Sequence, residues 1–366
     1  MTMVDQQPNL FDFATSELSQ DAWLCWLLAH VGLDTRPALR DAAHDFVARV
    51  WNGARPDDPI GPHDVDGPAH VERQWKHVDV LARLTVRGKL TILLVEDKTA
   101  TTQHDHQLER YLATVRETWP GASIVPVYFK TGYHYESDVA AREAGYQVIA
   151  LEVLVDLLDT HTHHIRNDIF ADFARAQRRQ LADRREALAA IEGSGGHLYL
   201  KRPFIQHAFL ARLRDAALVD GDLSRLNRGA NMDGSPWTHW AFAQSSTPLP
   251  GGPVETFFHR IDARQAPSGK RRYYLSTRQY ATVRKKDPAV REEKVRRLNT
   301  YRRLFDEVAA AVDLEFARPA TDRRGQNESE VGILFFDDER NSTANVLQRF
   351  RDVHRGFVER LRSSKP

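Results

Sequence analysis

The run Leu90-Thr91-Ile92-Leu93-Leu94-Val95, which ends in Glu96-Asp97-Lys98, constrains the fold of this chain more than any other segment. An aliphatic run of this length after a turn at Gly88 predicts a buried β-strand. Charged side chains at the end of a buried strand cost desolvation free energy unless they are paired or bind a metal. Because side chains alternate along a strand, we expect Glu96 and Lys98 on one face and Asp97 on the other.

A second strand is predicted upstream, over residues 75–84, and it contains Asp79. If the two strands pair as a hairpin, Asp79 lies beside Glu96. Two carboxylates with room for water and a phosphate oxygen suit Mg²⁺ or Mn²⁺. Such a metal lowers the pKa of a bound water, and Lys98 can orient that water or offset the phosphate charge. A Glu-x-Lys pair by itself is more often a solvated ion pair, so the metal site depends on the hairpin.

A helix predicted over residues 105–118 follows the hairpin and places Gln107 and Tyr111 one turn apart on one face. Together with Asp79 and Glu96-Asp97-Lys98, this Gln-x-x-x-Tyr helix resembles the PD-(D/E)xK nuclease superfamily, particularly its RecB-like branch. The segment from Phe11 to Ala22 also resembles the start of a bacterial group within it. The resemblance covers approximately residues 10–160. It departs from the motif in one place, because His77-Val78 precede Asp79 where the motif has a proline.

The resemblance implies that Asp79 and Glu96 are metal ligands and that Lys98 faces the attacking water or the phosphate. It gives Gln107 and Tyr111 auxiliary roles in catalysis. From the residues alone, Gln107 could instead be solvated and Tyr111 could belong to the core.

The first helix contributes a further acidic candidate, Glu17, which the resemblance makes an additional metal ligand. Asp21, one turn later, could take its place. A second interpretation stays open, because an acidic residue behind an N-cap such as Ser16 is favoured by the helix dipole in any protein.

The predicted elements give an α/β fold: a restriction-endonuclease-like αβββαβ core in residues 1–192, followed by a separate α+β domain in residues 197–366. The glycine-rich segment 193–196 breaks a long charged helix and marks the boundary. Residues 55–68, rich in Pro and Gly, are expected to form a loop. The second domain is expected to contain a largely antiparallel sheet.

Between residues 270 and 303, basic side chains outnumber acidic ones and tyrosines are interleaved with them. Cations neutralise phosphates and aromatic rings stack on unpaired bases, so the pattern predicts nucleic-acid contact. The candidate contacts are Arg284, Lys285, Lys286, Arg296 and Arg297. The alternative is a solvated helix face with i,i+4 ion pairs and tyrosines in the core.

Two smaller clusters remain unassigned. His161, His163 and His164, with Asp168 nearby, could bind a transition metal, although His clusters in a loop are usually solvated. Segments 227–229 and 236–238 could together form a pocket for a small molecule or a base.

Composition agrees with a soluble enzyme of the cytoplasm. The single cysteine, Cys25, excludes an internal disulfide, and neither a signal peptide nor an apolar stretch long enough to cross a bilayer is visible. The net charge of +1 provides no global attraction for nucleic acid.

The sequence therefore predicts a metal-dependent nuclease of bacterial defence or repair, with the second domain as a recognition unit or the site of a regulatory ligand or protein partner. DNA is favoured over RNA because the resembling superfamily mostly cuts DNA. Two alternatives stay open: a catalytically silent nucleic-acid-binding or effector-sensing protein, and an RNA-cleaving toxin-like enzyme.

Overall fold

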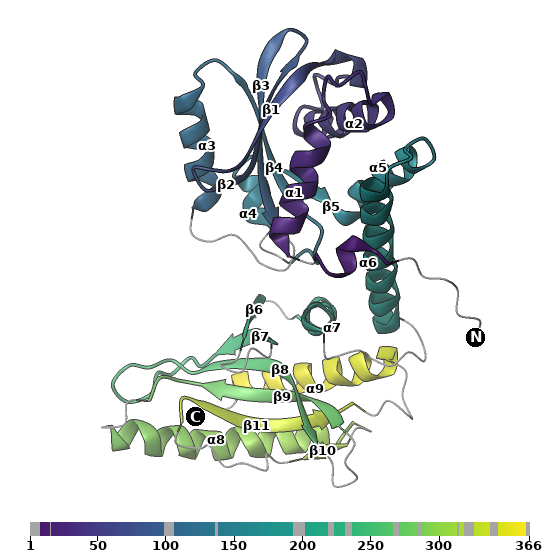
Figure 1. Cartoon of the computed structure of the whole chain (residues 1–366). Helices are drawn as coiled ribbons and strands as arrows, with labels where there is room; N and C mark the ends of the chain where they lie inside the picture. Colours follow the sequence, from purple (N-terminus) through teal and green to yellow (C-terminus); the bar gives the residue numbers. More distant parts are fainter. Residues whose placement is uncertain are drawn as a thin grey trace, which may run out of the picture. The chain divides into compact units, whose positions relative to one another are not determined.

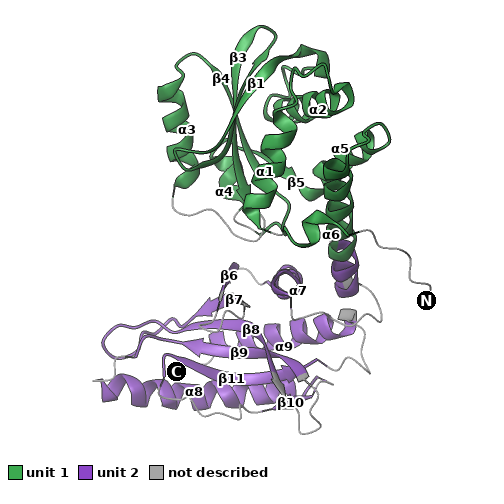
Figure 2. Cartoon of the chain, in the orientation of Figure 1, with its two compact units in different colours: residues 1–184 green, residues 185–366 purple. Residues whose placement is uncertain are grey.

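The computed structural model divides into two compact units, residues 1–184 and 185–366, coloured green and purple in Figure 2. Each unit is described by itself. The boundary predicted at residues 193–196 lies outside the described residues. The structure describes residues 8–14, 16–98, 106–135, 138–192, 202–218, 223–230, 236–265, 271–283, 287–312, 315–317, 326–336 and 343–363.

The first unit is a mixed α/β fold around a five-stranded sheet of order β1-β2-β3-β4-β5 (Figure 1). Strands β1 to β3 form an antiparallel meander, whereas β3, β4 and β5 are parallel. The elements along the chain are η1 (Leu10–Asp12), α1 (Glu17–Leu28), α2 (Pro37–Ala54), η2 (Pro62–Asp64), β1 (Val65–Trp75), β2 (Val78–Val86), β3 (Lys89–Lys98), α3 (Gln107–Thr118), β4 (Ser123–Lys130), α4 (Asp138–Glu143), β5 (Gln147–Ala150), α5 (Leu151–Thr162) and α6 (Asp168–Glu192). The last residues of α6, 185–192, belong to the second unit.

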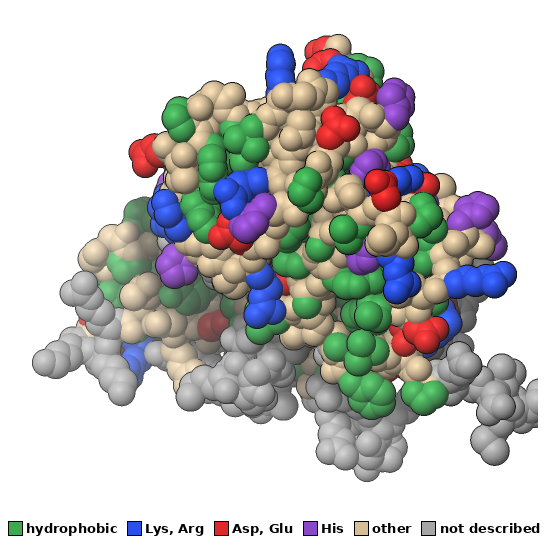
Figure 3. Space-filling model, turned by 45° about the horizontal axis from the view of Figure 1, so that its top comes forward, with side chains coloured by type: hydrophobic (Ala, Val, Ile, Leu, Met, Phe, Trp, Pro, Cys, Tyr) green, Lys and Arg blue, Asp and Glu red, His purple; other side chains and the backbone are tan. Residues whose placement is uncertain are grey.

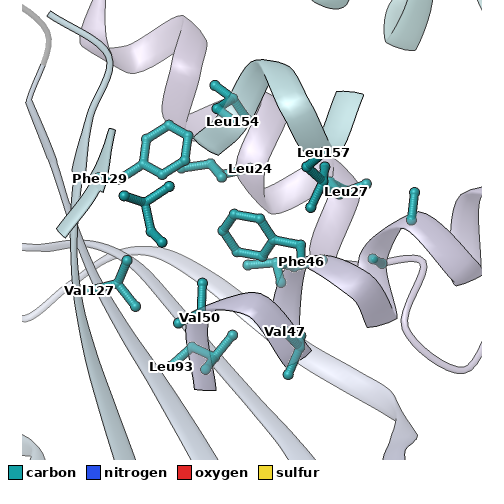
Figure 4. Packing of buried hydrophobic residues seen from close by; sticks show 14 of the residues in the cluster. Leu24, Leu27, Phe46, Val47, Val50, Leu93, Val127, Phe129, Leu154 and Leu157 are labelled. Atoms are coloured by element: carbon teal, nitrogen blue, oxygen red, sulfur yellow. The ribbon is translucent and has the colours of Figure 1, made fainter. Parts of the chain in front are cut away.

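Helices cover both faces of this sheet, which buries β3 on both sides. On one face, α1, α2 and α5 pack against the strands, and Phe46 of α2 meets Phe129 of β4 with ring centroids 6.2 Å apart (Figure 4). On the other face, Leu108, Leu112 and Val115 repeat at helical spacing along α3 and pack on the sheet. Removing a large buried ring such as that of Phe129 typically costs about 3–5 kcal/mol, so this packing holds the end of β3 in place.

Two expectations for the first unit were wrong. The loop expected over residues 55–68 ends earlier, because β1 begins at Val65; this edge strand is largely exposed and therefore lacks the alternating apolar pattern of a half-buried strand. The strand expected over residues 75–84 is divided, since Trp75 closes β1 and β2 starts at Val78. Residues 151–162 form helix α5 directly after β5.

The second unit is an α+β arrangement with a six-stranded antiparallel sheet of order β10-β11-β9-β8-β7-β6. The buried side chains of His259 in β8 and His354 in α9 meet at 2.9 Å between ring nitrogens, so α9 lies over the middle of one sheet face. The elements are α7 (Pro203–Ala217), β6 (Arg225–Ala230), β7 (Pro236–Gln244), β8 (Thr256–Gln265), β9 (Arg271–Tyr280), α8 (Pro288–Ala309), β10 (Phe316–Ala317), β11 (Glu328–Phe335) and α9 (Thr343–Ser363).

The surface carries mixed charge. On the face drawn in Figure 3, basic, acidic and histidine side chains are interspersed, in keeping with a net charge of +1. Among the described helices, none combines the length and apolar character needed to span a membrane. Any attraction for a polyanion must therefore come from a local group of side chains.

Candidate active site

The hairpin of β2 and β3 sets the register that brings the two candidate carboxylates together. Its two-residue turn, Arg87-Gly88, has φ angles of 47° and 72°, the left-handed pair that a type I′ hairpin turn requires. Val86 then faces Lys89, and Val80 faces Val95. The same register continues to the end of the hairpin and puts Asp79 opposite Glu96.

Glu96 is the centre of the site, and its carboxylate is almost completely buried. The Lys98 ammonium lies 2.7 Å from Glu96 Oε1 and 3.7 Å from Asp79 Oδ2. Gln107 Nε2 donates to the same Glu96 oxygen at 3.0 Å and lies 2.8 Å from the Tyr111 hydroxyl. Five residues predicted from the sequence are thus brought together by β2, β3 and α3.

Asp79 is held by the backbone and by the neighbouring turn. Its Oδ2 accepts the Asp97 backbone N–H at 2.9 Å, and its Oδ1 accepts Gln74 Nε2 at 3.0 Å. These two bonds fix the carboxylate plane without satisfying all of its lone pairs.

The electrostatics of the site favour a cation. Burial, and then the like charge of Asp79, raise the pKa of Glu96 to about 7, although Lys98 opposes this shift. Burial works against the charge on Lys98, but Glu96, Asp79 and Glu17 outweigh it and raise the pKa of the ammonium above its usual value. The acidic groups therefore create a negative potential that one ammonium only partly offsets.

Three oxygens converge on the position of the Lys98 ammonium. They are Glu96 Oε1 at 2.7 Å, the Asp97 carbonyl oxygen at 3.0 Å and Asp79 Oδ2 at 3.7 Å. The other carboxylate oxygen of Glu96, Oε2, is buried and has no hydrogen-bond partner. The Lys98 ammonium occupies the point where these three oxygens converge. The unpartnered Glu96 oxygen and the Asp79 carboxylate are the oxygen ligands that would suit Mg²⁺ or Mn²⁺.

The side chains alone do not complete a metal centre. Within the part of the chain that the structure describes, no three His, Cys, Asp or Glu side chains form a group that could hold a metal ion. A cation at Asp79 and Glu96 would therefore take its further ligands from the backbone and from water, as Mg²⁺ commonly does.

Glu17 and Asp21, the alternatives for an additional ligand, both lie near this end of the sheet. Glu17 opens α1 and acts on the site through its charge, which raises the pKa of Lys98. Asp21 is buried, and burial followed by the charge of Asp79 raises its pKa to about 6. Its carboxyl group meets that of Asp97, on the face of β3 opposite to Glu96.

A buried polar network behind the site was not predicted. Gln20 Nε2 donates to Asp97 Oδ1, and Thr131 Oγ1 donates to Gln20 Oε1 at 2.8 Å. Gln180 Nε2 of α6 then donates to the Thr131 carbonyl at 3.1 Å. The alternation of β3 indicated that Asp97 points away from Glu96, but the sequence holds no signal for which helix it meets.

The predicted nucleic-acid contacts divide into three groups. Arg284, Lys285 and Lys286 lie outside the described residues. Arg296 is exposed and pairs with Glu293 at 2.7 Å. Arg297 was wrongly predicted as a contact, because its side chain is only 5% exposed and its guanidinium lies 2.7 Å from Glu255 Oε2.

The structure also places His161 and the two segments that could form a pocket. His161 is in the last turn of α5 rather than in a loop, and its Nε2 lies 3.0 Å from Asp45 Oδ2. Segments 227–229 and 236–238 do meet, since β6 pairs with β7 and places Gly229 opposite Trp237.

Known proteins offer no guide to this site. No protein-family model matches the chain, and no curated protein or solved structure matches it either. The chemistry of the site therefore has to be inferred from its own residues.

Proposed function

We propose that the first unit is a metal-dependent phosphodiesterase that cleaves nucleic acid, with Mg²⁺ or Mn²⁺ held by Asp79 and Glu96. The observation that carries the proposal is the pair of carboxylates Asp79 and Glu96 at the end of a buried strand, both close to Lys98, with one buried Glu96 oxygen that has no hydrogen-bond partner. Buried polar atoms in proteins are nearly always hydrogen-bonded, and an unsatisfied one calls for an explanation. A bound cation supplies it.

Each residue of the site has its own role in the proposed reaction. When bound, the cation would activate a water molecule and stabilise charge on the scissile phosphate. Lys98 supplies a positive charge beside the reacting phosphate and orients the water. Gln107 holds the Glu96 carboxylate in place, and the Tyr111 hydroxyl 2.8 Å away limits the rotation of the Gln107 amide.

The resemblance to the PD-(D/E)xK superfamily supports the same function. With α2 as an addition between α1 and β1, the order α1, β1, β2, β3, α3, β4 is compatible with the αβββαβ core of the restriction-endonuclease-like fold, which we propose for this unit. The superfamily favours DNA as the substrate and bacterial genome defence or repair as the role. We propose that the second unit recognises the substrate or responds to a regulatory ligand or protein partner.

One panel of assays tests the proposal. Purified protein is incubated with linear duplex, circular duplex, single-stranded DNA and RNA, in Mg²⁺, Mn²⁺ or chelator. We expect metal-dependent cleavage that is lost in Asp79→Asn and in Lys98→Met. Lys89→Met is the matched control, since Lys89 is exposed at the opposite end of the same strand.

The outcomes separate the alternatives. Calorimetric titration should show that Asp79→Asn loses metal affinity and that Lys98→Met retains it. Cleavage of RNA alone would favour the toxin-like enzyme, and nucleic-acid binding without cleavage would favour a silent binding protein. Equal cleavage by parent and variants would refute the site.

A further inference from the structure

Two adjacent tryptophans, both partly buried against the core of the first unit, lie between two cations. The rings of Trp75 and Trp119 have centroids 4.9 Å apart. Lys76 Nζ lies 4.7 Å from the ring centroid of Trp75, and the Arg83 guanidinium carbon lies 5.6 Å from that of Trp119. We call these four side chains the tryptophan ladder.

The ladder is physically connected to the candidate site. Gln74, which precedes Trp75 in the sequence, donates to Asp79 at 3.0 Å. Lys76 Nζ lies 3.4 Å from the hydroxyl of Thr118, the last residue of α3, and Gln107 begins the same helix. The turn and the helix that carry the ladder therefore also carry groups of the site.

The ladder keeps positive charge accessible to solvent. Lys76 is exposed, and Arg83 pairs with Glu72 at 3.1 Å while both side chains remain about one-third exposed. Ion pairs this accessible contribute little to folding free energy and exchange readily with other anions. Phosphate oxygens are anions that a guanidinium and an ammonium both bind.

The turn between β1 and β2 has a sequence that its backbone does not favour. Trp75 pairs with Val78, so Lys76 and His77 form a two-residue turn, with φ angles of 47° and 73°. Left-handed positions in such a turn favour Asn-Gly, and another residue costs about 1–2 kcal/mol at each. The Lys76-His77 pair therefore lowers the stability of the fold. A sequence with this cost indicates a function for the two side chains.

We propose that the tryptophan ladder is the nucleic-acid contact that feeds the candidate site, and that it selects unpaired nucleotides. Lys76 and Arg83 each cover one tryptophan ring. When they turn to backbone phosphates, the ring face that they leave can stack on a base that is not paired. Bases in a continuous duplex are already stacked on their neighbours. The substrate is thus a single strand or a frayed end. This inference rests on the proposed function, and it names the substrate class.

A turn exchange tests the ladder without weakening the fold. Lys76→Asn combined with His77→Gly installs the favoured type I′ sequence and removes one lysine charge. Arg87→Asn is the matched control, because it creates Asn-Gly in the other two-residue turn of β2 and also removes one charge. Both variants are made in a Glu96→Gln background, so that binding is measured without cleavage.

Fluorescence anisotropy with a single-stranded oligonucleotide, at several salt concentrations, gives the readout. The Lys76/His77 variant should bind several-fold more weakly, and its slope of log K against log[salt] should be shallower by about 0.7. The Arg87 control should match the background protein. Trp119→Leu should lose roughly fivefold to a hundredfold in affinity for a normal strand, but much less for one with abasic residues.

The outcomes distinguish failure of the proposed function from failure of the tryptophan ladder. If the Glu96→Gln protein binds no nucleic acid at low salt, the proposed function fails. If it binds and the turn variant behaves as the Arg87 control does, the ladder is refuted and the substrate surface lies elsewhere. Equal affinity for duplex and single strand would overturn the preference for unpaired bases. A melting temperature for the turn variant at or above that of its background excludes unfolding as the cause.

Discussion

Glu96 and Glu255 are both buried carboxylates, but their surroundings differ in one respect. Glu255 has both oxygens satisfied: Oε1 accepts Gln279 Nε2, and Oε2 accepts Arg297 Nη1 at 2.7 Å and the Tyr301 hydroxyl at 3.1 Å. Glu96 directs one oxygen to Lys98 and Gln107 and leaves the other without a partner. The protein satisfies both oxygens of Glu255, whereas one oxygen of Glu96 is available to a ligand.

The comparison teaches that burial alone does not mark a functional acid. Both units take charges out of water, which costs several kcal/mol per ion unless partners replace the lost hydration. In the second unit, the partners come from β9 and α8, and the cluster is a structural anchor. In the first unit, the partners of Glu96 replace only part of its lost hydration. This is expected where a bound substrate or metal ion supplies the missing partner.

The largest expected effect is on cleavage. Glu96→Gln should slow hydrolysis by on the order of a thousandfold or more, because it removes one of the two proposed metal ligands and a transition-state charge interaction. The free energy of unfolding in chelator should not fall, since the variant relieves repulsion from Asp79. Single-turnover cleavage and urea unfolding measure the two quantities. If Glu96→Gln cleaved as fast as the parent, or were markedly destabilised, Glu96 would be a structural carboxylate like Glu255.

Next in size is the loss of the anchor in the second unit. Arg297→Met should lower the free energy of unfolding of this unit by about 3–5 kcal/mol, because it leaves the Glu255 carboxylate buried without its cation. Arg296→Met is the control, since Arg296 is adjacent to Arg297 in the sequence but its side chain is 57% exposed. Thermal unfolding of both variants decides the point. Similar midpoints would mean that Arg297 is dispensable and that the anchor is misassigned.

The third prediction concerns pH in the presence of chelator. The pKa of Glu96 is about 7 in the folded protein against an ordinary value of 4.5, so the folded chain retains a proton that the unfolded chain has lost. The contribution of Glu96 to stability should therefore be largest below pH 4.5 and be lost as pH rises through 7. Between pH 5 and 8 the parent should lose about 2–3 kcal/mol more than Glu96→Gln.

Urea midpoints at half-unit pH intervals measure this difference. Asp21, with a pKa raised to about 6, acts in the same direction at lower pH, so Asp21→Asn serves as a second comparison. Superimposable pH profiles for the parent and Glu96→Gln would show that the Glu96 carboxylate is not held in an unfavourable environment.

The smallest effects are expected at the residues that only position Glu96. Gln107→Ala should reduce turnover about tenfold without changing the melting temperature, since outer groups of this kind typically contribute 10–100-fold. Tyr111→Phe should have a smaller effect on turnover, because it keeps the ring and removes only the hydroxyl that meets Gln107. Lost stability in Tyr111→Phe, with full activity, would assign the tyrosine to the core instead.

Sequence reasoning worked where contacts are local. The alternation of β3, the hairpin turn and the helical spacing of Gln107 and Tyr111 fall within a short stretch of chain, so their geometry follows from backbone periodicity. Ion pairs between residues far apart in the sequence could not be predicted. The basic segment looked unpaired because only nearby acids were counted, whereas Arg278 pairs with Asp262, Glu328 and Glu330.

The same limit explains the missed elements. Strand β1 lies at the edge of its sheet and is mostly exposed, so it has no alternating hydrophobic pattern. Helix α5 begins at the residue after β5 ends, so its apolar residues continue those of the strand without a break. Lys294 also lies in the basic segment between residues 270 and 303, yet it is fully buried and donates to the Gln326 carbonyl at 2.6 Å and to Ser329 Oγ at 2.7 Å.

The mixed connectivity of the first sheet also has a consequence for the order of folding. Strands β1, β2 and β3 are joined by two-residue turns, whereas β3 reaches its parallel neighbour β4 only through a crossover that contains α3. Hairpins close within microseconds, and contacts between distant residues form more slowly. We therefore expect a nascent chain to pair Asp79 with Glu96 early, before β4 docks. Thr131, which follows β4, then locks Gln20 against the back of β3 in one of the last steps.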